Sequence, residues 1–212
     1  FSKHLQDCID FKNTRVWTQR EIAKKINTLN NKTLGIIGFG AIGKAIAKKA
    51  KAFNMKVVAI RRLQKKIEKK SIVDELMPMD KLDYVLSSSD FIVIACPLTP
   101  TTFHMINSKK LSLISKNSYL INISRGKIIN ENALIKALER GKLKGAALDV
   151  FDSEPLNTNS KLFKQNNVLL SPHISGNFID YQKEVINSFS DNLLRFVNNK
   201  PFKNRVCKKR LY

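Results

Sequence analysis

The segment 33–43, TLGIIGFGAIG, is the most informative stretch in this chain of 212 residues. Its apolar, β-branched first half is typical of a strand, and Gly38, Gly40 and Gly43 follow it in the spacing GxGxxG. In such a turn the first glycine permits a tight bend, the second lets a pyrophosphate approach the backbone, and the third lets a helix pack on the strand. Free N–H groups at the start of that helix then hold the phosphates. We therefore predict a dinucleotide site at these glycines; the alternative is a glycine turn that serves packing alone.

Short apolar runs alternate with helical stretches along most of the chain. The runs lack apolar–polar alternation, which is typical of strands buried on both faces of a parallel sheet. The expected strands are residues 33–38, 56–60, 91–95, 118–123, 145–150 and 167–170, and the expected helices are residues 41–53, 79–87, 108–114, 131–140 and 179–198. This order predicts an α/β fold: a Rossmann-type doubly wound parallel sheet with a short N-terminal arm and a long C-terminal helix.

Two of the expected helices carry local signals. In the helix after the glycine turn, the small residues Ala45, Ala47 and Ala50 are expected to face the sheet. In the fourth helix, Asn130 can cap the first turn, and Gly141 stands where a helix end needs a left-handed residue.

The chain is strongly basic, with 38 Lys and Arg against 17 Asp and Glu and a formal charge of +21. Such an excess suggests a nucleic acid or another anionic partner. The alternative is lysine spread over solvated faces, as in the run 61–70, and no aromatic-interleaved basic patch or recognition helix accompanies the charge. We therefore expect no nucleic-acid partner. We also expect no membrane partner, because no apolar run approaches the roughly 18–20 residues that span a bilayer.

The three cysteines, Cys8, Cys96 and Cys207, are an odd number and form no CxxC pair. This pattern argues against a zinc site or a disulfide framework, so we expect no metal and a reducing, cytoplasmic location.

The end of the second expected strand bears on the choice of cofactor. NAD sites place an acidic residue about 20 positions after the glycines, where it binds the ribose 2′-hydroxyl. Here Arg61 and Arg62 stand at that place, and guanidinium groups bind a 2′-phosphate where a carboxylate would repel it. We therefore expect NADP in preference to NAD. The alternative is that Arg62 belongs to the solvated run that follows it.

Polar residues follow four of the later strands, at the edge where open α/β sheets bind their ligands. These segments are CPLTP at 96–100, ISRG at 123–126, LDVFDSEP at 148–155 and SPHISG at 171–176. They offer one arginine, one histidine and candidate carboxylates. An enzyme that reduces a 2-oxo acid needs such a set, because a cation binds the carboxylate, a histidine supplies the proton, and an acid holds the histidine.

Two of these stretches carry a family resemblance. LINISRGKIINENALIKALERGKLKGAALDVFDSEPL at 120–156 and NVLLSPHISG at 167–176 resemble signatures of the D-isomer-specific 2-hydroxyacid dehydrogenases, and the similarity runs from about Trp17 to Tyr212. The resemblance implies that Arg125 binds the substrate and that His173 is the general acid and base with Glu154 as its partner. Asp149 would hold the nicotinamide carboxamide. The residues then expected to line the cofactor are Ala41, Ile42, Cys96, Pro97, Thr102, Ile123 and Ser124.

The resemblance also sets the expected organisation. Members of the family are longer and begin with a substrate domain, most of which this chain lacks. Residues 1–32 would then be an arm left from that domain, 33–178 the NAD(P)-binding domain, and 179–212 a helix and tail that pack back on the substrate domain.

The implied activity is hydride transfer between NAD(P)H and a small 2-oxo acid of the glyoxylate or hydroxypyruvate type, in a homodimer. The alternative is a non-enzymatic, dinucleotide-binding and dimerising module of the corepressor type. The intact Arg, Glu and His set argues against that alternative, because a pure binding protein does not need it.

Overall fold

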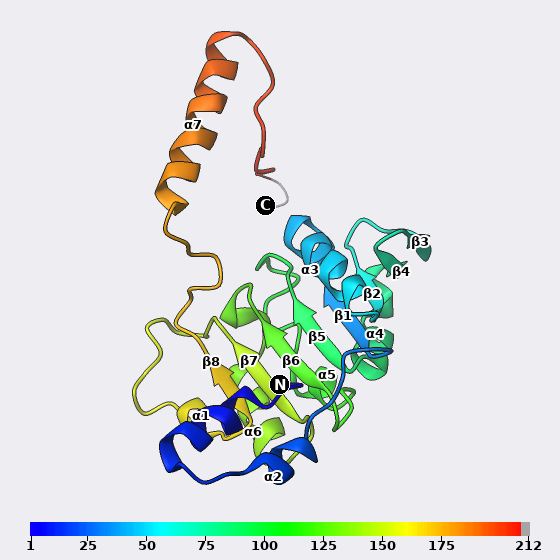
Figure 1. Cartoon of the computed structure of the whole chain (residues 1–212). Coiled ribbons are helices and arrows are strands. Elements are labelled where there is room, and N and C mark those ends of the chain that lie inside the picture. Colours follow the sequence, from blue (N-terminus) through cyan, green and yellow to red (C-terminus); the bar gives the residue numbers. More distant parts are fainter. Residues whose placement is uncertain (209–212) are drawn as a thin grey trace.

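The structure is a computed structural model that describes residues 1–208 (Figure 1). The last four positions of the expected C-terminal segment 179–212 therefore lie outside the described residues.

One sheet organises the described chain, with the strand order β3-β4-β2-β1-β5-β6-β7-β8. All neighbouring strands are parallel except β3 and β4, which pair antiparallel at one edge. The strands are β1 Thr33–Ile37, β2 Lys56–Ile60, β3 Glu68–Lys70, β4 Val73–Met77, β5 Phe91–Ile94, β6 Tyr119–Asn122, β7 Gly145–Leu148 and β8 Val168–Leu170. The six strands expected from the sequence and their parallel pairing are confirmed; β3 and β4 were not expected.

Five of the described helices lie where the sequence predicts them, with different lengths, and two more lie in the arm, where no helix bounds were predicted. They are α1 Leu5–Thr14, α2 Gln19–Ala23, α3 Ala41–Ala52, α4 Leu82–Ser88, α5 Ser108–Leu111, α6 Glu131–Glu139 and α7 Tyr181–Val197, with short 3-10 turns η1 Met79–Lys81, η2 Gly126–Ile128 and η3 Lys161–Lys164. Asn130 caps α6 as expected, because its Oδ1 accepts the Ala133 N–H at 2.9 Å. Gly141, just beyond α6, has the left-handed φ of 62°.

The sheet is buried on both faces, as the continuous apolar strands predict. In β1 and β2, Ile37 and Val58 belong to a cluster shared with α4 and α6, whereas Ile36 and Val57 belong to a second cluster shared with α3. Successive strand residues point to opposite faces, so the two clusters lie on the two sides of the sheet.

The prediction for Ala45 is wrong. The buried residues of α3 are Gly43, Ala47 and Ala50, which recur at three- and four-residue spacing on one helix face. Ala45 stands two positions from Ala47, points to another side of the helix, and is exposed.

The two ends of the chain lie outside this core. The arm, residues 1–32, carries α1 and α2, neither of which has a buried residue, and Phe1 stacks on Tyr119 with ring centroids 4.2 Å apart. Helix α7 also has no buried residue and extends away from the sheet (Figure 1). Within residues 1–208, none of the helices has the length and apolar character to cross a membrane.

Candidate active site

Two glycines of the turn after β1 are required by packing. Gly38 has a φ of 106°, and a Cβ atom there would lie 2.6 Å from the carbonyl group of Ala95. A Cβ atom at Gly43 would collide with the Gly38 carbonyl oxygen. Any larger residue at either position would therefore push the turn away from its neighbours.

Gly40 is different, because a Cβ atom there would meet nothing within 4 Å. It is the N-cap residue of α3, which has no side-chain cap and no acidic residue in its first turn. Such a helix start presents N–H donors and the positive end of the helix dipole to an anion. The open space and these donors fit a pyrophosphate, so the turn suits a dinucleotide as well as packing.

A cavity of about 280 Å³ lies beside the turn, between the ends of β1, β2 and β5. Its lining residues are Ile37, Gly38, Ile60, Arg62, Met79, Cys96, Pro97, Thr99, Thr101 and Thr102. Of the two arginines expected to read the 2′-phosphate, Arg62 lines this cavity. Both arginines are exposed, but Arg61 is not among the lining residues, and its backbone N–H donates to the Met77 carbonyl at 3.0 Å.

The loop after β5 is shaped by its own hydroxyl groups. Thr102 is buried, donates to the Pro97 carbonyl at 2.8 Å and accepts the Thr99 N–H at 2.7 Å. Burial raises the pKa of the Cys96 thiol to about 11, which keeps it protonated and unreactive at neutral pH. The Ser124 hydroxyl donates to the Cys96 carbonyl, so the loops after β5 and β6 are joined.

Glu154 and His173 come together from the loops after β7 and β8. His173 Nδ1 lies 2.7 Å from Glu154 Oε2, while Glu154 Oε1 accepts the Phe151 N–H at 2.9 Å. Partial burial acts to raise the pKa of Glu154, but the His173 and Phe151 hydrogen bonds, with the charges of His173 and Arg125, together lower it. Glu154 is therefore an ionised partner for the imidazole.

Arg125 stands in the loop after β6, on the same edge of the sheet. It is exposed, and its guanidinium donates to the Ser124 carbonyl at 2.7 Å. The Arg125 charge is the smallest of the causes that lower the pKa of Glu154. Ile123 and Ser124, which precede it, are half-buried.

Asp149 is buried at the end of β7, and its carboxylate is bound to the histidine loop. Oδ1 accepts the Ser171 hydroxyl at 2.6 Å and the Ile174 N–H at 2.9 Å, and Oδ2 accepts the Ser175 N–H at 3.0 Å. Burial acts to raise the pKa of Asp149, but these hydrogen bonds outweigh it and lower the pKa to about 2. The carboxylate thus fixes the loop that carries His173.

His173 itself has a left-handed backbone, with a φ of 53°. This conformation is uncommon for a residue other than glycine and costs of order 1–3 kcal/mol. The His173 N–H donates to the Asp149 carbonyl at 2.9 Å, and the Asp149 carboxylate holds the two residues that follow. The ring therefore reaches Glu154 from a backbone that is held on both sides.

Sequence reasoning missed Asn122, the last residue of β6, which is buried. Its side chain bonds to the backbone of Ser124 and Arg125. The available signal is a single polar residue at the end of the apolar run YLIN.

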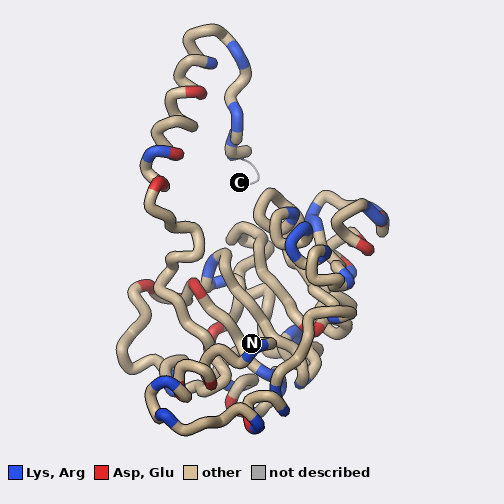
Figure 2. The backbone as a smooth tube through the Cα atoms, viewed as in Figure 1, with Lys and Arg blue, Asp and Glu red and all other residues tan. Residues whose placement is uncertain are grey.

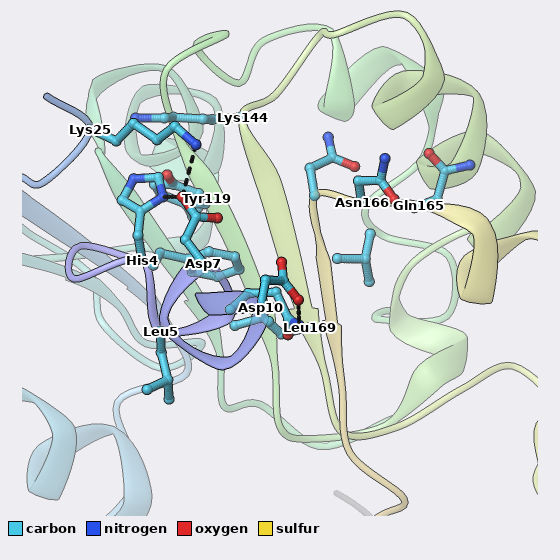
Figure 3. Close-up of a pocket in the computed structure, with 14 residues that line it drawn as sticks. His4, Leu5, Asp7, Asp10, Lys25, Tyr119, Lys144, Gln165, Asn166 and Leu169 are labelled. Atoms are coloured by element: carbon cyan, nitrogen blue, oxygen red, sulfur yellow. Dashed lines mark hydrogen bonds and ion pairs between the residues drawn. The ribbon is translucent and has the colours of Figure 1, made fainter. Parts of the chain in front are cut away.

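A larger cavity, about 800 Å³, lies at the opposite end of the sheet, between α1 and the starts of β6 and β8. Figure 3 shows His4, Asp7 and Lys25 together on one side and Gln165 and Asn166 on another. Lys25 Nζ is 2.8 Å from Asp7 Oδ2. The residues that line this cavity include none of the predicted site residues. Across residues 1–208, no group of three His, Cys, Asp or Glu side chains could hold a metal ion.

A comparison with known families identifies the family of this chain. Residues 1–175 match the model of the D-isomer specific 2-hydroxyacid dehydrogenase NAD binding domain. The chain belongs to this family. A glyoxylate reductase of Pyrococcus horikoshii is 45% identical over 165 residues, which are 78% of this chain and 48% of that protein. A glyoxylate reductase of Thermococcus litoralis is 43% identical over 180 residues, or 85% of this chain and 53% of that protein.

Solved structures of 2-hydroxyacid dehydrogenases share the fold. One from Xanthobacter autotrophicus, in complex with NADPH and MES, superposes with a TM-score of 0.86 at 27% identity and covers 100% of this chain and 84% of its own. A family protein from Aeromonas salmonicida superposes with a TM-score of 0.86 at 30% identity and covers 97% of this chain and 64% of its own. The chain spans about half the length of the curated dehydrogenase relatives it matches.

Proposed function

We propose that this chain is the nucleotide-binding and catalytic part of a reductase that transfers hydride from NADPH to a small 2-oxo acid of the glyoxylate or hydroxypyruvate type. The observation that carries the proposal is the 2.7 Å contact between His173 Nδ1 and Glu154 Oε2, on the same carboxyl edge of the sheet as the loop that carries Arg125. Curated relatives named glyoxylate reductase support the substrate class.

Arg125, Glu154 and His173 have different roles in the proposed reaction. Arg125 binds the carboxylate of the 2-oxo acid and polarises its ketone, for which its fixed charge is suited. Glu154 engages His173 Nδ1, orients the ring and stabilises its positive charge, so His173 Nε2 gives a proton to the developing alkoxide and takes it back in the reverse direction. When bound, the reduced nicotinamide supplies the hydride.

The cofactor would lie along the turn and the cavity beside it. Gly38, Gly40 and the start of α3 receive the pyrophosphate, and Arg62 in the cavity wall meets the 2′-phosphate. The proposal therefore favours NADP over NAD through Arg62 more than through Arg61. The cavity residues Cys96, Pro97 and Thr102 would then contact the cofactor.

The proposal extends to the organisation of the protein. Residues 33–178 would form the NAD(P)-binding domain, 1–32 an interdomain arm, and 179–212 a segment that packs back on a substrate domain. Trp17 in the arm is 75% exposed, and its indole ring provides an apolar surface for the contact between the two chains of a homodimer. The three free cysteines suit a reducing cytoplasm.

The test joins this chain to the N-terminal half of the Pyrococcus horikoshii relative and follows NADPH oxidation with glyoxylate and hydroxypyruvate. We expect turnover, and a fall in kcat/KM of roughly a hundredfold or more in His173→Ala and in Arg125→Ala. His104→Ala is the matched control and should keep full activity, because His104 lies outside the set. Normal turnover in both site variants would refute the assignment.

Two further outcomes separate the alternatives. Arg62→Asp should reduce the preference for NADPH over NADH by about tenfold or more, and Arg61→Asp should reduce it less. If neither changes the preference, the argument for NADP fails. Tight NADPH binding without turnover in the joined protein would favour the corepressor-type module.

A further inference from the structure

Asn122 is the last residue of β6, and its side chain bonds to the backbone of the loop that follows. We call this loop, residues 123–126, the arginine loop. The residue is 1% exposed at the carboxyl end of β6. Its Oδ1 accepts the Ser124 N–H at 3.1 Å, and its Nδ2 donates to the Arg125 carbonyl at 3.0 Å. Both polar ends of the buried amide are therefore used by the backbone of one loop.

The two hydrogen bonds of the Asn122 side chain hold the peptide groups on either side of the one that contacts the Arg125 guanidinium. The Ser124 N–H belongs to the peptide before Ser124, and the Arg125 carbonyl belongs to the peptide after Arg125. Between them lies the peptide that carries the Ser124 carbonyl, which accepts the Arg125 guanidinium at 2.7 Å. Fixing both flanking peptides fixes the direction of that carbonyl and, through it, the guanidinium.

The same strand end is joined to the histidine loop. The Asn122 carbonyl accepts the Asp149 N–H at 3.0 Å, and the Asp149 carboxylate holds Ile174 and Ser175. Asn122 thus fixes the position of the arginine loop relative to Asp149, whose carboxylate holds the loop that carries His173.

We propose that Asn122 is the positioning residue of Arg125, which it holds in the orientation that binds the substrate carboxylate. The inference rests on the proposed function of Arg125. It requires asparagine in particular, because the Ser124 N–H needs an acceptor and the Arg125 carbonyl needs a donor. Aspartate supplies only the acceptor, and alanine supplies neither.

The experiment uses the full chain with Asn122→Asp and Asn122→Ala. Asn130→Ala is the matched control, since Asn130 also binds backbone through its side chain but caps α6 instead. Oxalate, a dianion that resembles a 2-oxo acid, is titrated against the NADPH-saturated chain while NMR follows the Arg125 side-chain N–H. Amide hydrogen exchange of Ser124, Arg125 and Gly126 is measured in parallel.

We expect oxalate to bind about tenfold more weakly to both Asn122 variants than to the control. Amide exchange in the loop should be faster by about tenfold in Asn122→Ala, whereas Asn122→Asp should keep protection at Ser124, whose acceptor remains. If the alanine variant fails to fold, the aspartate variant carries the test.

Control-like oxalate affinity and unchanged exchange in the Asn122 variants would overturn the proposal. If the unmodified chain does not bind NADPH, the proposed function fails. If it binds NADPH but not oxalate, the oxalate titration is repeated on the chain joined to the N-terminal half of the Pyrococcus horikoshii relative. In either case unchanged exchange rates in the Asn122 variants overturn the positioning claim.

Discussion

Asp149 shows how one carboxylate can determine the shape of a loop, here residues 171–175. Its three donors come from Ser171, Ile174 and Ser175, and they surround a histidine held in a left-handed conformation. The family resemblance assigns Asp149 to the nicotinamide. Its contacts in the structure give it a second task, which is to hold the backbone on both sides of His173.

This task predicts a pH-dependent contribution to stability. The pKa of Asp149 falls from 3.8 to about 2 on folding, so its contribution is complete above the unfolded value and is lost as the pH falls through about 2. We expect Asp149→Asn to lower the free energy of unfolding by about 2 kcal/mol near neutral pH, with the deficit shrinking below about pH 4. Urea denaturation at a series of pH values measures it.

The matched control is Asp80→Asn, an exposed aspartate of η1. It should change the free energy of unfolding by less than about 0.5 kcal/mol at every pH. A deficit in Asp149→Asn that stays constant between about pH 6 and about pH 2 would contradict the linkage.

The sequence predicts that Arg125, Glu154 and His173 lie at one edge of the sheet, but not how they contact one another. Arg125, Glu154 and His173 each follow an apolar strand, and parallel strands end at one edge, so their proximity follows from the pattern. Their contacts depend on backbone angles that no spacing specifies, such as the φ of 53° at His173. Nothing in the sequence separates Asn122 from other polar residues at strand ends, because its role depends on two peptide groups beyond it.

At the scale of elements, the missed strand β4 has a physical explanation. Its residues Asp74 and Glu75 interrupt the apolar run, which made it look unlike a buried strand. Asp74 accepts Lys51 Nζ and the Val57 N–H, both at 2.8 Å, and Glu75 pairs with Lys56 at 2.7 Å. The charged residues of β4 therefore bind partners in α3 and β2. These partners lie about 20 residues away in the sequence, so the local pattern cannot reveal them.

Gly38 and Gly40, which precede helix α3, have different surroundings. The same substitution to alanine should therefore have different effects at the two positions. Gly40→Ala should leave the free energy of unfolding within about 0.5 kcal/mol, because its Cβ enters open space. It should weaken NADPH binding by about tenfold or more, because the same space receives the pyrophosphate. Chemical denaturation and NADPH titration of the chain measure the two effects.

Gly38→Ala is the counterpart. It should destabilise the fold by about 1–3 kcal/mol, because a side chain at a φ of 106° meets the Ala95 carbonyl. Unchanged NADPH affinity in Gly40→Ala would show that this glycine serves the turn alone and would remove the pyrophosphate from that position.

At the scale of the molecule, the basic charge is distributed and not focused. Figure 2 shows Lys and Arg on most elements, including the arm, α3 and the C-terminal segment. A field of this kind attracts anionic ligands without specifying one. The segment 61–70, which follows β2 and contains Arg62, brings part of this charge to the cavity beside the glycine turn.

This distribution predicts that NADPH binding depends on salt. Raising ionic strength from about 0.01 M to about 1 M shortens the screening length from about 30 Å to about 3 Å and should weaken NADPH binding by about tenfold or more. NADH, with one phosphate fewer, should respond less. Lys65→Glu, in the segment after β2, should flatten the NADPH response, whereas the distant Lys161→Glu in η3 should not. Equal salt responses of NADPH and NADH would contradict a contact with the 2′-phosphate.

Helix α7 has 17 residues, is about 25 Å long, and buries none of them within the described chain. Its helix–coil equilibrium is consequently separate from the cooperative melting of the sheet, since packing of an apolar face normally supplies most of a helix's stability. Val185, Phe189 and Leu193 are about half exposed or more along it. The helical content of this segment thus reports how far its apolar side is covered. Circular dichroism of the chain would register association through this segment as a gain of helix.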